Sequence, residues 1–88
     1  MPTRQRAVDR GKALGARHVA ELCREAEEVR LNANISYVAI GRALRISGWQ
    51  AARILRGQSR NVSLVRLAEV LAVVGLELSA RAFPAGTP

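Results

Sequence analysis

The sequence is poor in aromatic residues, in lysine and in cysteine. Its 88 residues include one Trp, one Tyr, one Phe and one Cys. A single cysteine excludes a disulfide within the chain, and a core built of Leu, Val, Ile and Ala must come from packed helices or from a second subunit. No apolar run approaches the ~20 residues of a membrane-spanning helix, and no secretion signal is recognisable. We therefore expect a single-domain, soluble, cytoplasmic protein that does not enter a membrane.

Acidic residues are missing from one long stretch. The 31 residues from Ser36 to Arg66 contain six arginines and neither Asp nor Glu, in a chain whose net charge is +7. A GC-rich genome would explain why Arg replaces Lys, but it would not explain the missing acids. A basic block that coincides with particular helices is typical of a surface that binds a polyanion and releases its counterions.

Apolar periodicity predicts a mainly α-helical chain of four to five short helices and one strand. Residues 1–15 are a basic arm without a clear period, either mobile or an irregular extension of the next helix. The predicted helices are Ala16 to Leu31, Tyr37 to Arg45, Gly48 to Arg56 and Leu64 to Val74, with Ser36, Ser47 and Ser63 as N-caps. Residues 76–84 alternate apolar and polar side chains, which predicts a β-strand, and 85–88 form a short tail.

The third predicted helix divides into two faces. Its apolar face carries Ala51, Ala52, Ile54 and Leu55, and the opposite face carries Trp49, Gln50, Arg53 and Arg56. A tryptophan among arginines suits a helix that reads DNA, because the indole can cover a thymine methyl group or a sugar while Arg pairs with guanine O6 and N7. The alternative is that Trp49 packs against a neighbouring helix or a second subunit.

Two short helices joined by a three-residue turn define a helix-turn-helix motif. The segments SYVAIGRALRISGWQAARILRG and SLVRLAEVLAVVG resemble the lambda-repressor-like, xenobiotic-response-element type of helix-turn-helix protein, over residues 16–75. The matching positions are Ser36, Gly41, Ile46, Ile54, Gly57, Ser63 and Leu64. Two residues depart from the usual pattern. Arg45 stands at the left-handed position of the turn, where the family usually has Gly, and Gly41 stands where Ala is commoner. Members of this family bind operator DNA as dimers and usually repress transcription.

The resemblance implies which residues contact DNA. Those facing bases in the major groove are Gly48, Trp49, Gln50 and Arg53, with Gln50 suited to adenine and Arg53 to guanine. Gly48, which has no side chain, would let the backbone approach the bases. The residues suited to phosphate are Tyr37, Arg45, Arg56, Ser59, Arg60 and Asn61. The basic arm either follows the DNA backbone or minor groove, or has no role in DNA binding.

The fourth predicted helix is apolar on nearly all sides. A stripe of Leu64, Leu67 and Leu71 predicts one buried face, and residues such as Val65 and Val70 point away from it, so the helix needs cover on two sides. A lone strand at 76–84 would also leave unpaired edges. Pairing with a second copy about a two-fold axis satisfies both needs, so we expect a homodimer through this helix and the strand. Alternatively, the chain is the DNA-binding fragment of a larger protein.

These features together predict a sequence-specific, dimeric DNA-binding transcriptional regulator, such as a prokaryotic repressor or an autoregulating antitoxin. Neither a metal set, a nucleophile with its base nor a phosphate loop is recognisable, so we expect no cofactor and no catalysis. Two alternatives remain open. One is an adaptor that binds another protein through the fourth helix and the strand, and the other is non-specific attachment to RNA or acidic surfaces.

Overall fold

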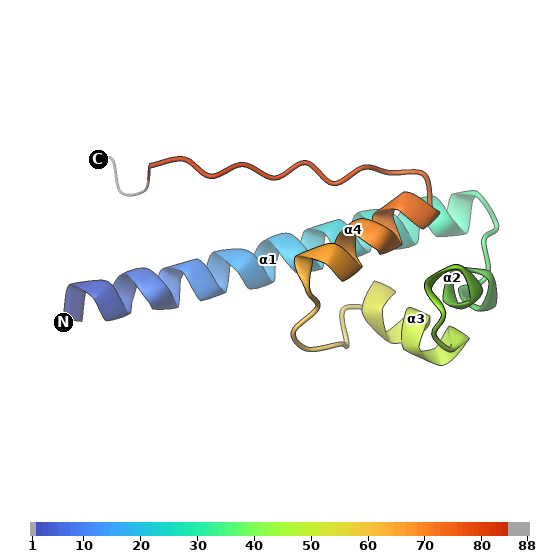
Figure 1. The fold of residues 1–88 in the computed structure, drawn as a ribbon, viewed down its shortest axis with the longest axis horizontal. Helices are drawn as coiled ribbons and strands as arrows, with labels where there is room; N and C mark the ends of the chain where they lie inside the picture. Colours follow the sequence, from blue (N-terminus) through green and yellow to red (C-terminus); the bar gives the residue numbers. More distant parts are fainter. Residues whose placement is uncertain (1, 85–88) are drawn as a thin grey trace.

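Helices account for all the regular structure in the described part of the chain (Figure 1). The computed structural model describes residues 2–84. Its elements in chain order are α1 (Pro2–Asn32), α2 (Tyr37–Leu44), α3 (Gly48–Leu55) and α4 (Leu64–Val73). The predicted mainly α-helical class is therefore confirmed. Over these residues, no helix combines the length and apolar character that crossing a membrane requires.

The first helix is much longer than predicted. The helix expected from Ala16 begins at Pro2, so residues 2–15 are helical rather than a mobile arm, and the alternative that they extend the first helix is correct. Every residue from Thr3 to His18 is exposed. In Figure 1 this half of α1 projects beyond the other three helices. Because this half of α1 buries no side chain, its sequence shows no apolar period.

The core lies where the second half of α1 meets α3 and α4, and α2 packs against α3 and α4. Its buried residues are Cys23, Ala26, Ile40, Ala51, Ile54, Leu55, Leu67, Val70, Leu71 and Val74. Burial raises the pKa of the Cys23 thiol, which makes this residue a neutral part of the packing. The stripe predicted for α4 was wrong at two positions, since Leu64 is 61% exposed and Val70 is buried. The buried side follows 67, 70, 71 and 74, the spacing of one helix face.

The turn between α2 and α3 requires glycine at position 41. A β-carbon added to Gly41 would lie 2.6 Å from the Ile46 carbonyl oxygen, so only glycine lets α3 approach α2 this closely. Arg45 adopts the left-handed conformation that was predicted for the turn, with φ 59° and ψ 42°. Ser36, Ser47 and Ser63 each accept a hydrogen bond from a backbone N–H of the helix that follows, which confirms all three predicted N-caps.

The predicted C-terminal strand is not present in the described residues. After Gly75 the chain is extended but pairs with no other segment, and it runs alongside α1 toward that helix's N-terminal end (Figure 1). Leu76 and Leu78 pack against the core, whereas Phe83 is 82% exposed. The alternating pattern predicted a strand, which was wrong for the described residues, because a strand also needs a partner for its N–H and C=O groups. The predicted tail at 85–88 lies outside the described residues.

Candidate nucleic-acid interface

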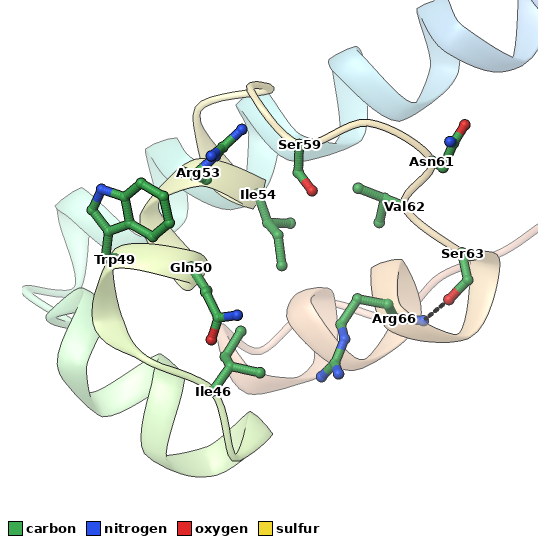
Figure 2. A pocket seen from close by; sticks show the side chains of 10 residues that line it. All are labelled: Ile46, Trp49, Gln50, Arg53, Ile54, Ser59, Asn61, Val62, Ser63 and Arg66. Atoms are coloured by element: carbon green, nitrogen blue, oxygen red, sulfur yellow. Dashed lines mark hydrogen bonds between the residues drawn. The ribbon is translucent and has the colours of Figure 1, made fainter.

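The outer face of α3 presents a tryptophan and an arginine to solvent. Ser47 and Gln50 form a reciprocal capping box that fixes where the helix begins. Ala51, Ile54 and Leu55 are buried on the inner side, and Arg53 is exposed on the outer side. Trp49 is 68% exposed, so it does not pack into the interior of this chain. Figure 2 shows both side chains projecting from the same helix.

Trp49 and Arg53 form a stacked pair. The guanidinium carbon of Arg53 lies 4.9 Å from the centre of the Trp49 ring, within the range of a cation–π interaction. Arg53 Nη2 also donates a hydrogen bond to the Gln58 carbonyl oxygen at 3.2 Å. The flat guanidinium is therefore held from two sides, by the indole and by the backbone that leaves α3. Most of its N–H groups remain available for an external acceptor.

Two of the four residues predicted to face bases have other roles. A β-carbon at Gly48 would meet Val38 of α2 at 3.1–3.3 Å, so the missing side chain permits helix packing rather than approach to bases. Gln50 Oε1 accepts a hydrogen bond from the Ser47 backbone N–H at 2.9 Å. An amide that reads adenine must offer both its oxygen and its NH₂ group, so the capping role of Gln50 competes with that reading.

A cleft lies between α3 and the loop that leads to α4 (Figure 2). Trp49, Gln50 and Arg53 line one side of it, and Ser59, Asn61, Val62 and Ser63 line the other. Arg66 of α4 also lines the cleft. Its Nη1 donates a hydrogen bond to the Leu44 carbonyl oxygen at 3.4 Å and lies 3.5 Å from Glu69 Oε1. The structure thus brings two of the predicted loop residues, Ser59 and Asn61, next to the outer face of α3.

The loop residues predicted for phosphate also border a second groove, on the side of α1. Ser59, Arg60 and Asn61 line it together with Lys12 of the projecting half of α1. Arg60 is exposed, and Asn61 adopts a left-handed backbone with φ 55°. Lys12 was not among the predicted contacts, because nothing local in the sequence relates position 12 to the loop at 59–61. Lys12 adds a second cation to Arg60 in the lining of this groove.

Tyr37 and Arg56, both predicted to contact phosphate, lie close to each other. The Tyr37 hydroxyl donates a hydrogen bond to Glu27 Oε2 at 2.5 Å, and the guanidinium carbons of Arg30 and Arg56 lie 3.9 and 5.3 Å from the centre of its ring. The Tyr37 hydroxyl is thus engaged by a carboxylate of α1, an interaction that competes with the predicted contact to phosphate. The Arg56 side chain is exposed to solvent.

Most arginines between Ser36 and Arg66 form no ion pair with an acidic side chain of residues 3–84. The one arginine of this segment that does so is Arg66, which pairs with Glu69. Arg45 is exposed at the left-handed end of α2, and Arg60 is exposed on the loop. Exposed arginines without an acidic partner raise the positive potential of the surface formed by this segment, and such a potential attracts polyanions.

The described residues contain no group of three or more His, Cys, Asp and Glu that could hold a metal ion.

Comparison of the chain with protein-family models, with curated proteins and with solved structures finds no match.

Proposed function

We propose that this protein is a sequence-specific DNA-binding transcriptional regulator of the cytoplasm that lays α3 in the major groove. The observation that carries the proposal is the exposure of Trp49 and Arg53 on one face of a helix whose other face is buried. A major groove about 12 Å wide admits an α-helix, and such side chains reach base edges there. The resemblance to lambda-repressor-like proteins agrees with this placement.

The charge distribution supports a nucleic acid as the partner. Arg45 and Arg60 flank α3 on its two sides along the chain and are both exposed. Lys12 borders the groove next to Arg60. Exposed cations that precede and follow a reading helix along the chain are candidates for phosphate contacts, because phosphate contacts position a protein while base contacts specify the sequence.

We further propose that the protein acts as a homodimer. The extended segment from Leu76 to Pro84 has no partner strand within the described chain, and the exposed apolar side chains of α4 include Val65, which is 72% exposed. Antiparallel pairing of this segment with its copy would complete the predicted strand and satisfy its backbone groups. Two-fold symmetry would also present two reading helices to a palindromic site.

A second candidate function is that of an adaptor that binds another protein. The specific observation in its favour is the exposure of Leu64 and Val65 together at the start of α4. An adaptor of this kind would use α4 and the extended segment, and its basic face would have no sequence preference for DNA.

Titration of labelled duplexes, monitored by anisotropy at several salt concentrations, tests the proposal. The duplexes are the DNA upstream of the protein's own gene and a scrambled version. We expect the wild-type protein to prefer one sequence strongly.

Arg53→Ala should lower the binding free energy by about 1–3 kcal/mol and relax the preference at one base position, whereas Arg60→Ala should weaken binding to all duplexes alike and lower the salt slope by about 1. Arg24→Ala, an exposed arginine of α1 that is not among the proposed contacts, is the control. Equal affinity for both duplexes would favour the adaptor instead.

A further inference from the structure

We infer that Trp49 and Arg53 together read a single base step in which a thymine lies next to a guanine. The inference rests on the proposed function, and it specifies what α3 recognises. It follows from which side chains of α3 are free, how the two free ones are held, and what their chemistry fits.

Two side chains of α3 are free to contact bases. Gly48 has no side chain, and the position of its missing β-carbon points to α2. Gln50 Oε1 is already engaged in the capping box at the start of α3. Ala51, Ile54 and Leu55 face the core. Trp49 and Arg53 are therefore the side chains of α3 whose functional groups are both exposed and free to meet a base edge.

These two side chains are coupled in space. Arg53 lies 4.9 Å from the centre of the Trp49 ring, and its Nη2 group is tied to the Gln58 carbonyl oxygen at 3.2 Å. Successive base pairs are about 3.4 Å apart along the helix axis. Two groups this close to each other can meet neighbouring base pairs but not widely separated ones. Recognition by the pair is therefore recognition of one step.

The chemistry of the pair selects the bases. A guanidinium forks onto O6 and N7 of guanine, and an arginine held in place beforehand loses less conformational freedom when it binds. The indole offers an apolar surface, and the apolar group in the major groove is the C5 methyl of thymine. The 5-methyl group of 5-methylcytosine would offer the same surface, whereas uracil and unmodified cytosine lack it. We therefore expect a site containing a thymine beside a guanine.

Enrichment of duplexes from a randomised library, followed by base analogues in the enriched duplex, tests this inference. The wild-type protein should enrich sites that contain the step. Replacing its thymine by uracil should weaken wild-type binding about fourfold, the effect of one buried methyl group. Trp49→Ala should bind the thymine and uracil duplexes equally. Trp49→Phe, which keeps an apolar ring, should still distinguish them.

The arginine is tested in the same duplex. Arg53→Ala should weaken binding about 5- to 150-fold, and 7-deazaguanine, which lacks N7, should weaken the wild type but not this variant. Arg53→Lys keeps the charge without the rigid fork, so it should keep the salt dependence and weaken the preference for guanine. Trp49 and Arg53 are both exposed, so these variants should keep the wild-type melting temperature.

The outcomes separate this inference from the proposed function. If the library yields no enriched sequence, the proposed function fails and the inference fails with it. If a sequence is enriched but the uracil and 7-deazaguanine effects do not depend on Trp49 and Arg53, or fall on separated base pairs, the protein reads DNA by other contacts. That result overturns the inference alone.

Discussion

Among individual residues, Glu27 accepts three side-chain hydrogen bonds in one polar cluster. It accepts hydrogen bonds from Arg30 Nε at 2.7 Å, from Arg30 Nη2 at 3.0 Å and from the Tyr37 hydroxyl. Arg30 in turn donates to the Ile35 carbonyl oxygen at 3.0 Å. The cluster joins the end of α1 to the start of α2, and so helps to set the orientation of the helix-turn-helix. The hydrogen bond from Arg30, more than any other contact, lowers the pKa of Glu27.

Glu27→Gln should therefore destabilise the fold, by about 1–3 kcal/mol, because it weakens charge-assisted hydrogen bonds in a half-buried site.

The stability that Glu27 contributes should also depend on pH, with a definite sign. Since folding lowers the pKa of Glu27, its contribution is present above the ordinary value of 4.5 and is lost as pH falls through the lower folded value. Urea unfolding at pH 7 and at decreasing pH measures both effects. The exposed Glu25→Gln is the matched control. Equal stability of the two variants at pH 7 would contradict this account.

Among the elements, the turn between α2 and α3 contains a residue, Arg45, that lowers the stability of the fold and is also a candidate phosphate contact. Arg45 is a non-glycine residue in the left-handed region, which costs about 1 kcal/mol. It is also exposed and positively charged on the side proposed to face phosphate.

Arg45→Gly should consequently change stability and DNA binding in opposite directions. Removing the left-handed penalty should stabilise the fold by up to about 1 kcal/mol. Losing one phosphate contact should weaken binding to all sequences and reduce the salt slope by about 1. Thermal unfolding and salt-dependent titration measure the two effects. If the variant gains stability and keeps the full salt slope, Arg45 does not contact phosphate.

For the whole molecule, the parts that the sequence predicted well are those with a local cause. Serine caps, the small residue at 41 and the left-handed turn at Arg45 depend on neighbours within a few positions. The outward direction of Trp49 followed from the period of one helix.

The parts that were missed depend on what surrounds a segment. Residues 2–15 show no apolar period because that half of α1 has no buried face, although it is helical. Residues 76–84 have the period of a strand, but strand formation needs a partner outside the segment. The hydrogen bond from Tyr37 to Glu27, ten residues earlier, has no sequence signature. Gln50 was predicted to contact a base, and its side-chain oxygen is engaged by the Ser47 backbone N–H, so the two uses compete for the same oxygen.

The central claim is that the exposed face of α3 meets DNA, and Trp49, the only tryptophan of the chain, reports on it directly. We therefore propose titrating the protein with its enriched duplex while recording tryptophan fluorescence, for the wild type and for Arg53→Ala. The account predicts a saturable change in Trp49 emission with the specific duplex, shifted to higher DNA concentration in the variant. Trp49 emission that stays constant while anisotropy shows tight binding, with the variant binding as well as the wild type, would contradict it.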